Sequence, residues 1–158
     1  MTAPRSFVDT NVFVYAADES PEEQNKHKVA SALLATDPDA LVISTQVLQE
    51  FYVTVTRKLR IPLPEERAAS AVRGIAKLEV VQVDVPLVLA AVDTSRVVKI
   101  SLWDALVIEA ARQAGCQRIL TEDLSHGQVI RGVAVENPFL ANHPPPDQTP
   151  KRLPGPTT

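Results

Sequence analysis

Four acidic residues, Asp9, Glu50, Asp104 and Asp123, stand at places in the sequence where a carboxylate can do chemistry. Asp9 ends a short apolar run, and Asp123 follows a second such run at 118–121. Ligands of open α/β sheets bind at the carboxyl ends of the strands, so both acids suit a binding site. A helix cap for Asp9 and an ordinary acidic loop around Asp123 explain the same positions, and the local pattern leaves both explanations open.

Asp104 lies near the start of a predicted helix at 101–114, three residues after Ser101, which suits a capping box. A helical wheel at about 100° per residue separates Asp104 from the polar stripe of this helix. That stripe consists of Glu109, Arg112 and Gln113. We therefore expect Asp104 to be partly buried, which is costly for a carboxylate unless it is paired or bound to a metal ion.

Glu50 has less local support than the other three acids. The predicted helix Thr45–Lys58 buries an apolar face made of Val47, Leu48, Phe51, Tyr52 and Val55. Glu50 falls on the opposite side of the wheel, near Thr54 and Arg57. A solvated helix surface is a sufficient explanation for an acid at that position.

The elements that position these acids follow from apolar runs that alternate with helix-like stretches. The predicted strands are Ser6–Asp9, Leu41–Ser44, Val80–Asp84, Arg118–Thr121 and Val133–Glu136. The predicted helices are Asn11–Ala17, Asn25–Leu34, Thr45–Lys58, Pro64–Lys77, Pro86–Val97 and Ser101–Ala114. Such alternation predicts an α/β fold with a mostly parallel sheet of about five strands and helices on both faces.

The chain has 158 residues, which is the size of one domain. We expect residues 1–139 to form that domain and residues 140–158 to be a disordered tail. The stretch from Pro138 onward holds seven of the 13 prolines, and proline neither donates within strands nor fits inside helices. A tail that binds a partner is the alternative.

The overall composition excludes several classes of protein. A formal net charge of -3 does not suit nucleic-acid binding over a broad basic surface, so any such role depends on a local site. Cys116 is the only cysteine, which excludes an internal disulfide and a cysteine-based metal site. The start of the chain has no signal-peptide pattern, and no run approaches about 18 apolar residues. We therefore expect a cytoplasmic protein without a membrane segment.

Four short motifs occur in a characteristic order along the chain. They are Phe7-Val8-Asp9-Thr10-Asn11, Gln49-Glu50-Phe51, Leu102-Trp103-Asp104-Ala105 and Leu120-Thr121-Glu122-Asp123-Leu124, the last continuing through His126-Gly127-Gln128 to Asn137-Pro138-Phe139. In this order and spacing, residues 5–139 resemble the PIN-domain family, and in particular the VapC-type toxins of bacterial toxin–antitoxin pairs.

The resemblance implies a three-layer α/β/α sandwich that acts as a ribonuclease. The acidic positions that it implies are Asp9, Glu50, Asp104 and Asp123. The supporting polar groups that it implies are Thr10, Asn11 and Thr121. Glu122 is either a further acid of the site or points away from it. The resemblance also implies a cognate antitoxin that covers the site, and often a homodimer.

Four clustered carboxylates favour a cation, because two unit charges 4 Å apart interact by about 4 kcal/mol at an effective dielectric near 20. Hard oxygen ligands select Mg²⁺ or Mn²⁺. Zinc-like spacing is missing from the three histidines, His27, His126 and His143. The expected metal ligands are Asp9, Asp104 and Asp123. Glu50 would bind a second ion or orient the water that hydrolyses an RNA phosphodiester.

The densest basic run of the chain consists of Arg57, Lys58 and Arg60. It follows the predicted helix that carries Glu50, so these side chains are candidate contacts to RNA phosphates. A favourable positive charge at the C-terminus of that helix explains the run equally well.

Two other functions fit parts of this pattern. A PIN-like module that binds RNA or protein without cleaving would keep the fold, but the intact set of four acids argues against it. An aspartate-based phosphotransferase or receiver domain also places acids at strand ends. Here Asn11 stands where the second acid of an Asp-x-Asp pair is needed, and residues 121–123 occupy the place of a receiver's lysine.

Overall fold

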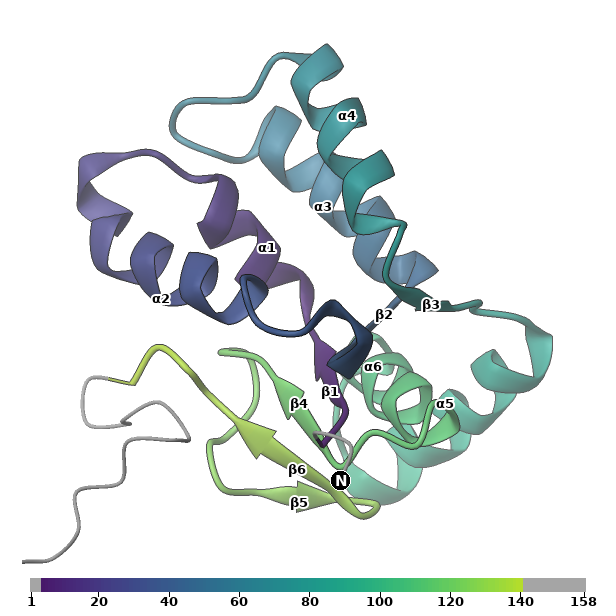
Figure 1. Ribbon diagram of the computed structural model, residues 1–158. Helices are drawn as coiled ribbons and strands as arrows, with labels where there is room; N and C mark the ends of the chain where they lie inside the picture. The colour runs from purple at the N-terminus through teal and green to yellow at the C-terminus, as the bar shows by residue number, and fades with distance from the viewer. Residues whose placement is uncertain (1–3, 141–158) are drawn as a thin grey trace, which may run out of the picture.

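The computed structural model describes residues 4–140, and a six-stranded sheet runs through the middle of the molecule (Figure 1). Its strand order is β3 (Glu79–Val81), β2 (Leu41–Ser44), β1 (Ser6–Val8), β4 (Arg118–Leu120), β6 (Val133–Glu136) and β5 (Val129–Ile130). The first five of these strands are parallel, as predicted, and β5 pairs with β6 in the antiparallel sense. The sequence prediction missed β5, because two residues are too few to show a period.

Within residues 4–140 the structure contains six α-helices, and all six were predicted. They are α1 (Thr10–Ala17), α2 (Gln24–Leu34), α3 (Thr45–Arg57), α4 (Glu65–Ile75), α5 (Val85–Val98) and α6 (Leu102–Gln113), with short 3₁₀ turns at Pro21–Glu23 and Pro38–Ala40. Four of the helices start at a side chain that accepts a hydrogen bond from a backbone N–H of the first turn. These caps are Asp9, Ser44, Asp84 and Ser101.

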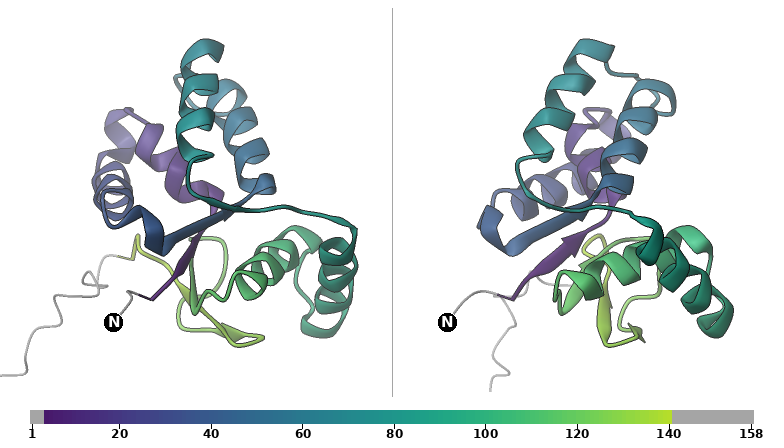
Figure 2. Two further views of the ribbon diagram at one scale, coloured as in Figure 1. Left: turned by 45° about the vertical axis from the view of Figure 1, so that its right-hand side comes forward. Right: turned by 90° about the vertical axis from the view of Figure 1, so that its right-hand side faces the viewer.

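The helices form layers on the two faces of the sheet (Figures 1 and 2). Helices α5 and α6 cover one face, where α6 packs on the strands and α5 packs on α6. Helices α1, α2 and α3 lie on the other side, and α3 and α4 form a hairpin that projects away from the sheet. The predicted three-layer α/β/α architecture is therefore confirmed.

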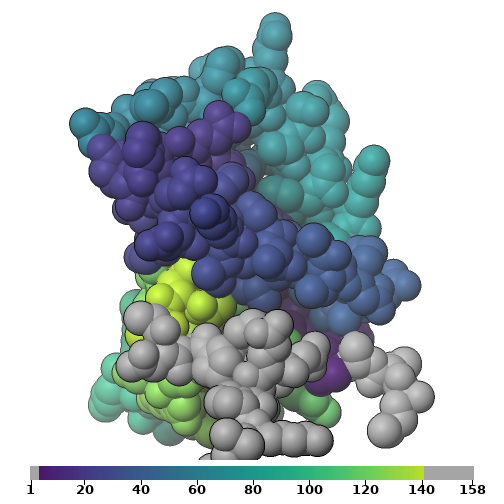
Figure 3. Space-filling model, turned by 60° about the vertical axis from the view of Figure 1, so that its left-hand side comes forward, coloured from purple at the N-terminus to yellow at the C-terminus, as the bar shows by residue number. Residues whose placement is uncertain are grey.

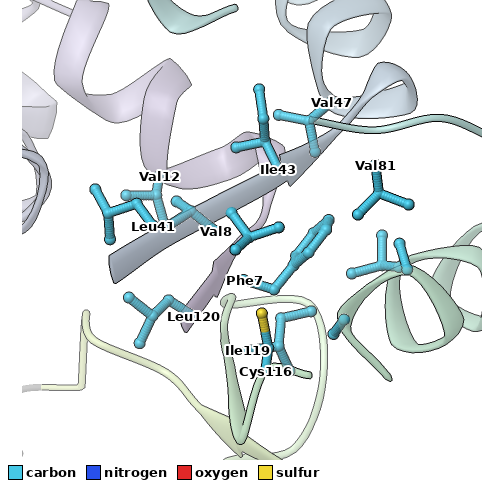
Figure 4. Packing of buried hydrophobic residues seen from close by; sticks show 14 of the residues in the cluster. Phe7, Val8, Val12, Leu41, Ile43, Val47, Val81, Cys116, Ile119 and Leu120 are labelled. Carbon is cyan, nitrogen blue, oxygen red and sulfur yellow. The ribbon is translucent and has the colours of Figure 1, made fainter. Parts of the chain in front are cut away.

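Aliphatic side chains on both faces of the central strands form most of the core (Figure 4). Phe7 of β1 and its register partner Ile119 of β4 are both fully buried. Burial on both faces is expected for a parallel strand that has helices above and below it. Cys116 is also buried, which raises the pKa of its thiol to about 11, so it packs as a small apolar residue.

Helix α6 corrects one prediction from the helical wheel. Glu109 was assigned to the polar stripe of this helix, yet only 6% of it is exposed. Its carboxylate accepts a hydrogen bond from the Thr94 hydroxyl of α5 at 2.6 Å and pairs with Arg112 and Arg131 at 3.0 and 3.1 Å. The wheel failed because α5 covers the side of α6 that was taken as the surface. Asp104, at the start of α6, is partly buried, as expected.

The order of the strands determines where a site can form. The chain passes from β1 to β2 on one side, and returns much later to add β4 on the other side of β1. Binding sites of open α/β sheets form at such a switch point, beyond the carboxyl ends of the strands. The backbone N–H of Asp9 donates to the carbonyl oxygen of Leu120 at 3.0 Å, so the ends of β1 and β4 are joined there.

No helix within residues 4–140 combines the length and the apolar character that crossing a bilayer requires. The proposed tail at 140–158 lies outside the described residues apart from Leu140, so its disorder stays a prediction.

Candidate active site

Asp9 lies at the centre of the site, where β1 ends and α1 begins. Its Oδ1 accepts the backbone N–H of Thr10 at 2.8 Å, and its Oδ2 accepts the hydroxyl of Thr121 at 2.7 Å. Only 6% of the residue is exposed. Burial, together with the negative charges of Asp123 and Glu50, raises the pKa of Asp9 to about 7, against the two hydrogen bonds that lower it. The helix cap, one of the two explanations that the sequence left open, is therefore present, and the same carboxylate also lies beside Thr121 at the end of β4.

Thr121, at the end of β4, links Asp9 to Asp123. Its buried hydroxyl accepts the side-chain amide of Asn11 and the backbone N–H of Asp123, both at 3.1 Å, while it donates to Asp9. The same Asn11 amide donates to Asp123 Oδ2 at 3.3 Å. Burial raises the pKa of Asp123, and the charges of Glu122, Asp104 and Glu50 act in the same direction, whereas the Asn11 hydrogen bond lowers it.

Glu50 is half-buried and turned toward Thr10, so the solvated helix surface, which the wheel alone allowed, does not describe its position. Its Oε2 accepts the hydroxyl of Thr10 at 2.8 Å, and its Oε1 accepts the side-chain amide of Gln46 at 2.8 Å. The wheel identified the apolar face of α3 correctly but could not show that α1 packs beside α3 and brings Thr10 to Glu50. Gln46 was not predicted, and the signal that could have found it is its place one helical turn before Glu50.

Asp104 approaches the cluster from the opposite layer. Its backbone N–H donates to the Ser101 hydroxyl at 3.0 Å, which is the helix cap expected from the sequence. Its negative charge contributes to the raised pKa of Asp123, so the two carboxylates lie within electrostatic reach of each other. The structure thus brings acids from the junction of β1 and α1, from α3, from α6 and from the segment after β4 to one edge of the sheet.

The donor set suits a hard cation but is not preassembled around one. Within residues 4–140, no three His, Cys, Asp or Glu side chains already form a metal-binding group. Hydroxyl and amide groups donate instead to the carboxylates of Asp9, Glu50 and Asp123. In this part of the chain none of the four acids forms an ion pair with Lys or Arg. A cation would offset this uncompensated charge, and oxygen ligands favour Mg²⁺ or Mn²⁺.

The family profile of the PIN domain matches residues 6–130. The chain belongs to the PIN-domain family. Solved structures with a similar fold include VapC20 of Mycobacterium tuberculosis, described as a toxin that cleaves the sarcin-ricin loop, at 24% identity and a TM-score of 0.56 over 72% of this chain and 86% of that one. No curated protein matches the chain.

Two further structures resemble this PIN domain over nearly their full length. A toxin–antitoxin complex from Klebsiella pneumoniae is 17% identical with a TM-score of 0.61, covering 84% of this chain and 97% of the other. VapBC of Salmonella typhimurium, solved bound to DNA, is 19% identical with a TM-score of 0.62, covering 85% and 98%. At these identities the likeness shows a shared fold.

The three basic residues predicted to contact RNA phosphates, Arg57, Lys58 and Arg60, differ in whether they already form an ion pair. Arg60 is paired with Glu22, so its charge is already engaged. Arg57 and Lys58 are exposed at the end of α3, about two helical turns beyond Glu50. All three predicted phosphate contacts are exposed, but within residues 4–140 Arg57 and Lys58 form no ion pair, whereas Arg60 does.

Proposed function

We propose that this PIN domain is a metal-dependent ribonuclease that hydrolyses RNA phosphodiester bonds at the four-carboxylate site. The observation that carries the proposal is the buried Asp9 carboxylate at the β1–β4 switch point. Hydrogen bonds through Thr10 and Thr121 connect it to Glu50 and Asp123, and the cluster holds more negative charge than its partners offset. Membership of the PIN-domain family supports a nuclease.

The acids and the polar residues around them have different roles in the proposed reaction. Asp9, Asp104 and Asp123 would hold Mg²⁺ or Mn²⁺, which when bound lowers the pKa of a coordinated water and offsets charge on the phosphoryl oxygens. Thr121 and Asn11 hold two of these acids in place by hydrogen bonds. Glu50, fixed by Thr10 and Gln46, would orient the attacking water or hold a second ion.

Arg57 and Lys58 are the proposed contacts to the RNA backbone. The chain is acidic overall, so attraction of the phosphates depends on local positive charge. Arg57 is the last residue of the helix that carries Glu50 and Lys58 is the C-cap of that helix, so an RNA strand bound at the site could extend along α3 to reach them.

Metal-dependent cleavage of RNA tests the proposal directly. We expect the purified chain to degrade a mixed RNA pool in Mg²⁺ or Mn²⁺, and to lose this activity in excess EDTA, because the carboxylates cannot stabilise phosphoryl charge by themselves. Restoring either ion should restore cleavage. Intact RNA with both ions present would contradict the nuclease proposal and favour a PIN-like module that only binds.

We further propose that the chain is the toxin of a toxin–antitoxin pair, with a protein antitoxin that covers the site and with a homodimer as the working unit. The similar folds of toxin–antitoxin complexes support this role. Inside a cell, an uninhibited ribonuclease of this kind should arrest growth.

Expression in bacteria tests the toxin role. We expect induction of the wild-type chain to stop growth, and induction of Asp9→Asn at the same protein level to leave growth unchanged, because only the former cleaves RNA. Growth that continues at normal rate with soluble, RNA-cleaving wild-type protein would argue for a nuclease without a toxin role.

A further inference from the structure

Glu122 lies next to Asp123 in the chain, yet its carboxylate is bound on the other side of the segment. Its Oε1 accepts the hydroxyl of Tyr15 at 2.6 Å, and its Oε2 pairs with the ammonium group of Lys26 at 3.0 Å. Lys26 also donates to the Tyr15 hydroxyl at 3.0 Å. Each of the three polar groups therefore contacts the other two, and Glu122 is not available to the acid cluster.

Aromatic packing holds this group from a further direction. The rings of Tyr15 and Phe139 meet edge to face with centroids 4.9 Å apart. The Lys26 ammonium lies 4.7 Å from the Tyr15 centroid and 5.8 Å from that of Phe139, within the range of cation–π attraction. In Figure 3 the yellow surface near residue 140 lies against the purple and blue surface of the N-terminal helices. Residues from α1, α2 and the segments after β4 and β6 thus meet at one point.

The backbone ties this group to the proposed metal site. Glu122 is the residue between Thr121, which bonds Asp9, and Asp123. Its own backbone N–H donates to Asn11 Oδ1 at 3.4 Å. Tyr15 of α1 and Lys26 of α2 hold the side chain of Glu122. Thr121 and Asp123, which flank Glu122 in the chain, form hydrogen bonds with Asp9 and Asn11 of the candidate site. Moving Glu122 would therefore move Asp123.

We propose that Lys26, Tyr15 and Glu122 are positioning residues, which hold the segment after β4 so that Asp123 faces Asp9 and Glu122 stays out of the metal site. This inference rests on the proposed metal-dependent function. Residues of this kind, which orient a metal ligand without touching the metal, typically change metal affinity by about 10- to 100-fold when they are lost.

The charge of Lys26, acting alone, predicts a change in Mn²⁺ affinity opposite to the one that loss of positioning predicts. The direction of the measured change therefore tests the proposal. Lys26 is a cation close to an acidic cluster, so removing only its charge should make binding of Mn²⁺ stronger. Loss of positioning should make binding weaker. A variant that removes the interaction while keeping the net charge separates the two effects.

The test is the Mn²⁺ affinity of the full chain, measured by electron paramagnetic resonance of the free ion. We expect Lys26→Met combined with Glu122→Leu, which leaves the net charge unchanged, to bind Mn²⁺ about tenfold more weakly than wild type. Lys26→Arg keeps a cation that can pair with Glu122, and should bind within about twofold of wild type on the same scale.

The control is the loss of another ion pair at the far end of the sheet. Arg5, just before β1, pairs with Glu79 at the start of β3. Arg5→Met combined with Glu79→Leu removes a pair with the same net charge change but should keep wild-type Mn²⁺ affinity. Equal weakening in both double variants, or wild-type affinity in the Lys26 and Glu122 variant, would overturn the positioning role. Absence of Mn²⁺ binding in wild type would instead overturn the proposed function on which it rests.

Discussion

The Asp9→Asn variant should cleave RNA about a thousandfold more slowly than wild type at saturating substrate. Under the proposed mechanism the variant would lose, together with its central ligand, an ion that stabilises the transition state by several kcal/mol, and each 1.4 kcal/mol is about a tenfold change in rate. Because the lost interaction acts on charge that develops during the reaction, kcat should fall far more than KM changes. Steady-state kinetics on a defined RNA substrate in Mn²⁺ measures both.

The matched control for this variant is Asp93→Asn on the exposed side of α5. It makes the same chemical change far from the site, and should leave kcat within about twofold, as expected for a surface substitution. Thermal unfolding of both variants shows whether the fold persists. If Asp9→Asn retains kcat within tenfold of wild type while folded, Asp9 does not hold the catalytic ion.

The second large effect is a loss of stability with rising pH when metal is removed. The pKa of Asp9 is about 7 in the folded protein and ordinarily 3.8. Between these two pH values the folded state keeps a proton that the unfolded chain has released. Stability from this group is therefore complete below pH 4 and falls as pH rises to about 7. The linked change is at most about 4 kcal/mol, and the raised pKa of Asp123 acts in the same direction.

Denaturant unfolding in EDTA across pH 4–8 measures this dependence. The Asp9→Asn chain should show a much flatter profile, since asparagine does not titrate. Addition of Mn²⁺ at pH 8 should stabilise wild type and leave Asp9→Asn nearly unchanged, because the ion offsets the buried charge only where the charge exists. Parallel pH profiles for the two proteins in EDTA would show that Asp9 does not retain its proton on folding.

The sequence predicted the five parallel strands and the two acids whose positions depend on them. One run of apolar residues ends at Asp9 and another precedes Asp123, and both runs can be recognised locally. Parallel pairing of β1 with β4 then brings Asp9 close to Asp123. That inference needs only the rule that binding sites collect at the carboxyl ends of strands. Asp9 and Asp123 were therefore placed at the same edge without knowledge of the helix packing.

Glu50 and Glu109 show where such reasoning stops. A wheel describes one helix in isolation, and the surroundings of Glu50 depend on Thr10, 40 residues earlier, across the α1–α3 contact. The burial of Glu109 depends on α5, whose position on α6 no periodic pattern reveals. Long-range packing between helices of different layers decided both cases, and the family resemblance, rather than the wheel, assigned Glu50 to the site.

The pairing of β1 with β4 also determines when the candidate site can assemble during synthesis of the chain. Thr121 follows Asp9 by 112 residues, and the hydroxyl that orients Asp9 arrives only when β4 has been made. At about 5–20 residues per second, a ribosome needs several seconds to cover that distance. Between residues 50 and 104 the growing chain carries Asp9 and Glu50 without Asp104, and Asp123 follows only 19 residues after Asp104. The candidate site is therefore completed only after most of the chain has been made. Until then the nascent chain lacks the full set of four acids while it is still bound to the ribosome, which is itself rich in RNA.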